Sequence, residues 1–165
     1  MNVLEFSHCI SDELKAKLLE GALSAKYTHH ITSWGEVIGL EWADASNVDA
    51  SELTNLIPFT PNGQLFIKFN AGEHIDLHID DTPSRVSCLS VALLPSYDKF
   101  TPVNYYNSMD ADAELVETYY YNEHPVVLNT MAVHAVFDVK YDRYMFQLMY
   151  TNPIEDFVKY ADSSS

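Results

Sequence analysis

The chain has 165 residues, of which 47% are hydrophobic and 13% aromatic. This length and composition suffice for one folded domain with an apolar core. Only 9 residues are Lys or Arg, against 24 that are Asp or Glu, and the formal net charge is −15. Because nucleic-acid affinity depends on clustered cations that neutralise phosphates, this charge argues against contact with extended DNA or RNA.

The cysteines and the N-terminus indicate the cellular compartment. Cys9 and Cys88 are too few and too far apart for a disulfide framework, so we expect both thiols to be reduced. The N-terminus has no basic stretch followed by a long apolar one, and no segment approaches the roughly 20 apolar residues of a membrane helix. We therefore expect a cytoplasmic protein without membrane contact, with a frayed tail over residues 161–165.

The first third of the chain predicts helices around one strand-like segment. Ser11 stands at an N-cap position, and apolar residues then recur at helical spacing, which predicts a helix from about Asp12 to Ala25. Residues 31–42 mix aromatic and β-branched types around glycines and indicate a strand or hairpin. Residues 49–57 suggest a second, shorter helix, which Pro58 would end.

From residue 64 the pattern changes to short β-branched and aromatic segments separated by turn residues. The expected strands cover residues 65–69, 74–80, 86–94, 103–106, 115–121, 126–128, 134–139 and 143–150. Many short strands after one or two helices indicate a β-barrel or sandwich with a helical buttress. We expect one domain over residues 1–165, with a helical part to about residue 60 and a β core over about 62–152.

The segment 74–80, His-Ile-Asp-Leu-His-Ile-Asp, alternates strictly between polar and aliphatic residues. Because side chains in a strand change sides at every residue, each His-x-Asp pair places an imidazole beside a carboxylate on one face. A 2-His-1-carboxylate iron site needs one more imidazole, from a strand distant in sequence. His134 can supply it, from a run of small and apolar residues.

The two His-x-Asp pairs of this segment compete for the metal. We favour the second, His78 and Asp80, because it stands at the end of the strand, where a site can open to solvent. The polar residues of the first pair, His74 and Asp76, would then line the pocket, support the ligands or face solvent. His124 is a weaker third ligand than His134, because it lies in a turn and lacks the basic residue that stands nine positions after His134.

The pattern Gly72…His78-x-Asp80…His134…Arg143 resembles the Fe(II)/2-oxoglutarate-dependent dioxygenases, especially the small prolyl-hydroxylase-like and aspartyl-hydroxylase-like members of bacteria and phages. The resemblance covers more than half of the chain. It implies a double-stranded β-helix, the cupin-like jelly roll, in which His78, Asp80 and His134 hold Fe(II). It also implies that 2-oxoglutarate is the cosubstrate and that O2 takes the remaining metal position.

Arg143 opens an apolar strand, where an unpaired guanidinium is costly. Under the resemblance it binds the far carboxylate of 2-oxoglutarate, which the guanidinium fork matches. The alternative is an ion pair with an acid such as Asp138 or Asp142. Arg85 is either a cation at the rim of the pocket or a surface charge, and we favour the surface.

The chain departs from the prolyl-hydroxylase-like pattern at Ile75. Many of those members carry a tyrosine three residues before the first metal histidine, where it contacts the cosubstrate. Here another group must take that role, and Tyr105, Tyr97 and Asn104 are candidates, with Tyr105 carried forward as a cosubstrate-binding residue.

Together these residues predict a dioxygenase that hydroxylates a small-molecule or protein substrate with release of succinate and CO2. One alternative is a cupin-like metal-binding protein or enzyme that does not use 2-oxoglutarate. The other is a non-catalytic jelly-roll module. Substrate choice depends on loops that one sequence does not decode, and neither the substrate nor the oligomeric state is indicated.

Overall fold

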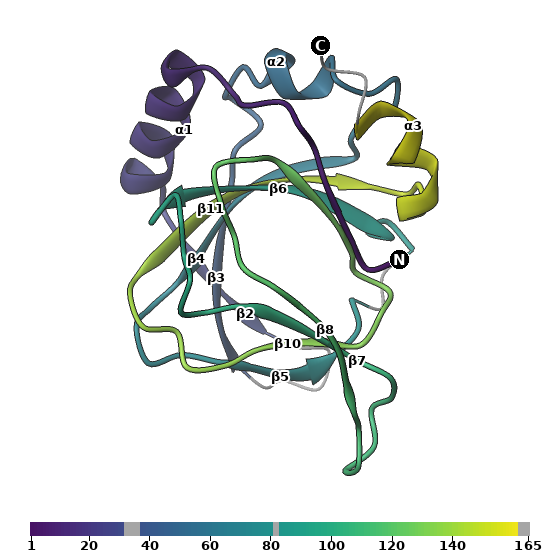
Figure 1. The fold of residues 1–165 in the computed structure, drawn as a ribbon. Coiled ribbons are helices and arrows are strands. Elements are labelled where there is room, and N and C mark those ends of the chain that lie inside the picture. Colours follow the sequence, from purple (N-terminus) through teal and green to yellow (C-terminus); the bar gives the residue numbers. More distant parts are fainter. Residues whose placement is uncertain (32–36, 81–82, 162–165) are drawn as a thin grey trace.

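The computed structural model describes residues 1–31, 37–80 and 83–161, and its strands form two antiparallel sheets (Figure 1). The large sheet contains, in spatial order, β1 (Val3–Glu5), β9 (Val126–Asn129), β6 (Ser87–Leu94), β11 (Arg143–Tyr150), β4 (Gly63–Phe69), β3 (Val37–Asp44) and β2 (Thr28–Ile31). The small sheet contains β5 (Ile75–His78), β10 (His134–Val136), β7 (Val103–Tyr106) and β8 (Leu115–Tyr119). The helices are α1 (Asp12–Ser24), α2 (Ser51–Thr54), η1 (Ile154–Phe157) and α3 (Val158–Ala161).

From β4 onward the chain passes back and forth between the two sheets. Strands β4, β6, β9 and β11 belong to the large sheet, and β5, β7, β8 and β10 to the small one. Most of these strands therefore pair with strands that are distant in sequence, as in a double-stranded β-helix; β8 pairs with its sequence neighbour β7. The predicted jelly roll with a helical buttress is confirmed.

The core has two layers, one on each face of the large sheet. Helices α1, α2 and α3 cover one face, and the small sheet faces the other (Figure 1). Along β11, Phe146 and Leu148 pack toward the helices, whereas Met145 belongs to the cluster between the sheets. Because side chains alternate along a strand, Arg143 and Gln147 share the inward face with Met145.

The first 60 residues are less helical than expected. Helix α1 begins as predicted, and its Ser11 cap accepts a hydrogen bond from the backbone N–H of Leu14 at 3.2 Å. The second helix is confined to Ser51–Thr54, and β1, β2 and β3 join the large sheet. Residues 32–36 of the expected strand or hairpin, and 162–165 of the expected tail, lie outside the described residues.

Within the described residues, no helix is long and apolar enough to cross a membrane.

Candidate metal centre

A β-bulge in β5 determines which way the side chain of His78 points. His134 of β10 lies opposite His78, but Val136, two residues on, lies opposite Ile75, three residues back along β5. The extra residue makes Ile75 and His78 face the same side, between the sheets, so the expected strict alternation does not hold along the whole segment. The first His-x-Asp pair, His74 and Asp76, is exposed to solvent.

The structure brings His78, Asp80 and His134 together. One potential ligand atom from each residue lies within 4.8 Å of the other two. The two imidazole rings have centroids 4.2 Å apart, and Nε2 of His78 lies 3.6 Å from Oδ1 of Asp80. Asp80 follows the end of β5, where its backbone N–H donates to the carbonyl of Thr130 at 2.8 Å.

Both histidines present the nitrogen that a metal requires. Nδ1 of His78 contacts the carbonyl of Asp76 at 2.7 Å, and Nδ1 of His134 contacts the carbonyl of Ala132 at 2.8 Å. A carbonyl only accepts, so each Nδ1 is the protonated nitrogen and Nε2 keeps its lone pair. Burial, and then the neighbouring His78, lowers the pKa of His134 to about 4, which keeps this ring neutral at physiological pH.

Arg85 lies inside the site, and the expectation of a surface charge was wrong. Its Nε is 3.1 Å from Oδ2 of Asp80, and only 22% of its side chain is exposed. Its Nη2 donates to Oε1 of Gln147 at 2.9 Å, and Nε2 of Gln147 donates to Ser90 at 3.1 Å. The Nε–Asp80 contact is electrostatic, because no acceptor is aligned with the Nε–H. Arg85 thus engages one carboxylate oxygen while the other faces His78.

Arg143 is buried and ion-paired, although not with the acids considered from the sequence. Its Nη2 donates to Oδ2 of Asp98 at 3.0 Å and to the carbonyl of Thr101. The Arg143 and Asp98 side chains are 1% and 4% exposed. The expected alternative partners, Asp138 and Asp142, are both exposed.

The ion pair leaves part of the guanidinium unsatisfied. Nε and Nη1 of Arg143 are buried and have no hydrogen-bond partner among the residues that the structure describes. The group lies near two aromatic rings, 5.7 Å from the centroid of Phe69 and 5.2 Å from that of Tyr121. Buried N–H groups without an acceptor are costly, and those of a cation especially so. An anion between the sheets would satisfy them.

Three residues were proposed to contact the cosubstrate, and of these Tyr105 lies beside His134. It pairs with His134 across β7 and β10, and the two ring centroids are 5.7 Å apart. Its hydroxyl is buried and has no hydrogen-bond partner within the described part of the chain. Tyr97 is 64% exposed, and the side chain of Asn104 accepts a hydrogen bond from Thr118.

Sequence reasoning missed two further residues near the site. Asp98 comes from the loop before β7, and nothing in the sequence around it indicates that it meets Arg143. His30 of β2 lies close enough for the charges of Asp80 and Arg85 to act on its pKa, which burial lowers. For Arg85, the sequence offered one hint of a role in the site, namely that the chain has only 9 Lys and Arg residues.

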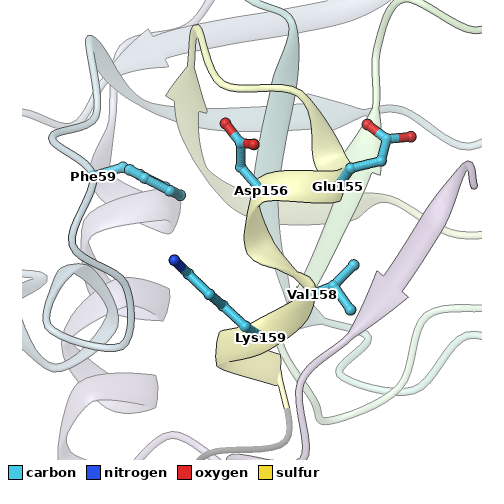
Figure 2. A pocket seen from close by; sticks show the side chains of 5 residues that line it. All are labelled: Phe59, Glu155, Asp156, Val158 and Lys159. Carbon is cyan, nitrogen blue, oxygen red and sulfur yellow. The ribbon is translucent and has the colours of Figure 1, made fainter.

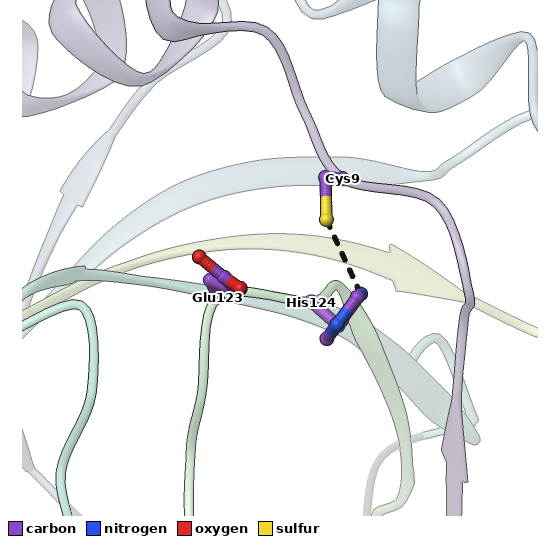
Figure 3. Close-up of side chains that lie close together, drawn as sticks. All are labelled: Cys9, Glu123 and His124. Atoms are coloured by element: carbon purple, nitrogen blue, oxygen red, sulfur yellow. Dashed lines mark hydrogen bonds between the residues drawn. The ribbon is translucent and has the colours of Figure 1, made fainter.

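Two other features lie away from this cluster. His124, the weaker third ligand in the sequence, belongs to a separate group with Cys9 and Glu123 (Figure 3). A shallow hollow on the helical side of the large sheet is lined by residues of the 3-10 helix η1, of α3 and of the segment after α2 (Figure 2). Its lining residues are Phe59, Glu155, Asp156, Val158 and Lys159.

No protein-family model matches the sequence, and no curated protein matches it. Solved structures do match the fold. A prolyl hydroxylase from Trichoplax adhaerens, in complex with a hypoxia inducible factor peptide, has a TM-score of 0.64 at 10% identity, over 90% of this chain and 83% of that one. A 2OG-Fe(II) oxygenase family protein from Burkholderia pseudomallei has a TM-score of 0.61 at 7% identity, over 92% and 86%.

A Pseudomonas putida prolyl-4-hydroxylase has a TM-score of 0.57 at 13% identity, over 90% of this chain and 92% of that one. The topology defines a double-stranded β-helix protein. More particularly, its fold is the one found in these two solved prolyl hydroxylases and in the solved 2OG-Fe(II) oxygenase family protein.

Proposed function

We propose that this chain is an Fe(II)- and 2-oxoglutarate-dependent dioxygenase that hydroxylates a small-molecule or protein substrate, with release of succinate and CO2. The observation that carries the proposal is the combination of two features between the same sheets. One is the 2-His-1-carboxylate group of His78, Asp80 and His134. The other is the buried Arg143 guanidinium, whose Nε and Nη1 have no acceptor.

The donor set fits iron. Two neutral imidazoles and one carboxylate are the ligands of non-haem Fe(II) oxygenases, and they leave coordination positions open. The backbone carbonyls that accept from each Nδ1 fix the ring orientations, as outer partners of metal-bound histidines commonly do. Arg85 restrains the Asp80 carboxylate, so that one oxygen is directed toward His78.

The unsatisfied donors fit 2-oxoglutarate. Arg143 would bind the far carboxylate through the free N–H groups of Nη1, while Asp98 and the Thr101 carbonyl hold Nη2 in place. The Tyr105 hydroxyl is a further donor near His134. When bound, Fe(II), 2-oxoglutarate and O2 supply the oxidising chemistry. The chain orients them and excludes water.

Composition supports two finer proposals. The net charge of −15 favours a substrate other than an extended nucleic acid. Cys9 and Cys88 are both free thiols, which supports a reducing compartment, and we propose the cytoplasm.

The test is an anaerobic titration of the metal-free protein with Fe(II) and then with 2-oxoglutarate. We expect the weak visible charge-transfer band of the chelate in the wild type and its loss in His78→Ala and His134→Ala. His74→Ala is the matched control, because His74 is exposed on the same segment and belongs to the competing pair. Loss of the band in His74→Ala alone would move the metal to the first pair.

Arg143→Lys tests the cosubstrate site separately. Lysine keeps the charge that pairs with Asp98 but loses the fork, so we expect iron affinity to be unchanged. The concentration of 2-oxoglutarate that half-saturates the band should rise about 10- to 150-fold, as expected for losing about 1.5–3 kcal/mol of charged hydrogen bonding. Tyr105→Phe should cause a smaller rise.

The alternatives give different results. If iron binds without the band at any 2-oxoglutarate concentration, the protein is a cupin-like metal protein that does not use this cosubstrate. If no metal binds, it is a non-catalytic jelly-roll module. If the band forms, succinate release that is coupled to candidate substrates would identify the substrate class.

A further inference from the structure

The second cluster of metal-binding residues joins two segments that are far apart in sequence. Strand β1 pairs with β9, and just beyond β1 the backbone N–H of Phe6 donates to the carbonyl of Pro125 at 2.9 Å. This pairing carries the chain onward to Cys9, beside the turn that contains Glu123 and His124. Figure 3 shows the thiol and the imidazole directed toward each other, with the Glu123 side chain next to them.

The donor atoms already have the spacing of a metal site. One potential ligand atom from each of Cys9, Glu123 and His124 lies within 4.8 Å of the others, and Sγ of Cys9 is 3.6 Å from Nδ1 of His124. In a tetrahedral Zn2+ site, Zn–S and Zn–N bonds of about 2.3 and 2.0–2.1 Å place sulfur and nitrogen about 3.6 Å apart. A metal would therefore fit between these two atoms without moving the backbone.

The turn that presents two of the donors is held by contacts that do not involve the metal. Oδ1 of Asn122 accepts from the backbone N–H of His124 at 2.8 Å, and Nδ2 of Asn122 donates to Glu5 at 2.7 Å. Glu5 is the last residue of β1, so the same contact ties the turn to the strand that leads to Cys9. Three protein donors are thus arranged in advance, which reduces the ordering that metal binding requires.

We propose that Cys9, Glu123 and His124 form a second metal site, distinct from the cluster between the sheets, that binds Zn2+ or a similar borderline divalent cation. A thiolate, an imidazole and a carboxylate are typical zinc ligands, whereas the first cluster has no sulfur. Cys9 and Glu123 are exposed, so water has access to the fourth position. The bound ion would link the segment after β1 to the turn before β9.

The test uses Co2+ as a spectroscopic substitute for Zn2+, added to the full-length chain under anaerobic, reducing conditions. A thiolate–cobalt charge-transfer band in the near ultraviolet reports on a thiolate ligand, and the first cluster contains no cysteine. We expect this band to rise to saturation as Co2+ is added and to be abolished by Zn2+. It should remain in His78→Ala, which removes a donor of the first cluster only.

Matched variants separate the site from a general thiol effect. Cys9→Ser should abolish the band, whereas Cys88→Ser should leave it intact, because Cys88 is buried and lies near Ser90. His124→Gln and Glu123→Gln should each weaken Co2+ binding at least about tenfold. Circular dichroism checks that each variant is folded, which the exposed or half-buried positions of Cys9, Glu123 and His124 favour for their variants.

Three outcomes would overturn the proposal. They are no thiolate band in the wild type, a band that persists in Cys9→Ser, and unchanged binding in both His124→Gln and Glu123→Gln, which would mean adventitious binding by the thiol. None of these outcomes affects the iron titration of His78, Asp80 and His134. The second site and the dioxygenase function therefore stand or fail separately.

Discussion

Asp98 and Arg143 bury opposite charges, with 4% and 1% of their side chains exposed. Removing ions from water has an effective penalty of several kcal/mol per ion, which only close pairing and further hydrogen bonds offset. Asp98 has such support, because its Oδ1 accepts from the backbone N–H groups of Phe100 and Thr101 at 2.9 and 3.0 Å. The carboxylate of Asp98 therefore stabilises both the loop before β7 and the buried guanidinium of Arg143.

We predict that Asp98→Ala lowers the free energy of unfolding of the metal-free protein by about 3–5 kcal/mol, because it leaves a buried guanidinium without its counter-charge. Urea unfolding followed by circular dichroism measures the change. Asp142→Ala is the control, because Asp142 is exposed and accepts from the backbone N–H of Ala71. Equal effects of the two substitutions would contradict the assigned role of Asp98.

Several residues of the candidate site could be predicted from the sequence, and others could not. His78, Asp80, His134 and Arg143 stand out because strand alternation and spacing make their chemistry visible in a single chain. The position of Arg85 beside Asp80 is a tertiary contact, which no local pattern encodes.

At the scale of elements, the approach of β3 to the start of β5 controls where His78 lies. A Cβ atom built on Gly39 would lie 2.7 Å from the backbone carbonyl of His74 and 2.6 Å from the carboxylate of Glu73. Real Cβ atoms do not approach a backbone oxygen this closely, so one of the two segments must move. Glycine at position 39 permits the close contact that positions the start of β5 against β3.

We predict that Gly39→Ala destabilises the protein by about 1–3 kcal/mol and weakens Fe(II) binding, because it displaces the strand that carries His78. Thermal unfolding and iron titration measure the two effects. Gly72→Ala is the control. Its φ of +89° makes the substitution strained by about 1–2 kcal/mol, but a Cβ there meets nothing within 4 Å. It should lower stability and leave iron affinity unchanged, and a parallel loss of iron in both variants would count against the β5 mechanism.

The strands with a clear hydrophobic pattern were predictable, and the irregular ones were not. Alternation and β-branched residues identify β4, β7 and β11 within two residues of their observed ends. Strand β2 has the sequence Thr-His-His-Ile and is mostly exposed at the edge of the sheet, so it carries no hydrophobic signal. The β5 bulge arises from pairing with β10, and the strict alternation of residues 74–80 conceals it.

At the scale of the whole molecule, the two sheets enclose nearly balanced charge although the chain as a whole carries −15. Arg85 lies against Asp80, and Arg143 against Asp98, so each described cation between the sheets has a carboxylate beside it. Under the proposed function, Fe(II) would add two positive charges and 2-oxoglutarate two negative ones. The loaded interior would again be neutral, which avoids the penalty of an unpaired buried charge.

The tyrosines packed around the large sheet make the fold sensitive to alkali. Burial is the main cause that raises the pKa of five of them above the ordinary value of 10.0: Tyr27, Tyr105, Tyr119, Tyr121 and Tyr150. In the unfolded chain these phenols ionise near pH 10, whereas in the folded protein they stay protonated. Their contribution to stability is therefore complete below pH 10 and is lost as pH rises above it.

We predict that tyrosine ionisation, followed by absorbance near 295 nm, includes a cooperative step that coincides with the loss of the β-sheet circular dichroism signal above pH 10. Tyr150→Phe should move this step to higher pH, because it removes an ionisable phenol whose hydroxyl is buried without a partner. If all the tyrosines instead ionise smoothly near pH 10 while the sheet signal persists, the phenols reach solvent without unfolding. That result would contradict the tight packing of these tyrosines against the large sheet.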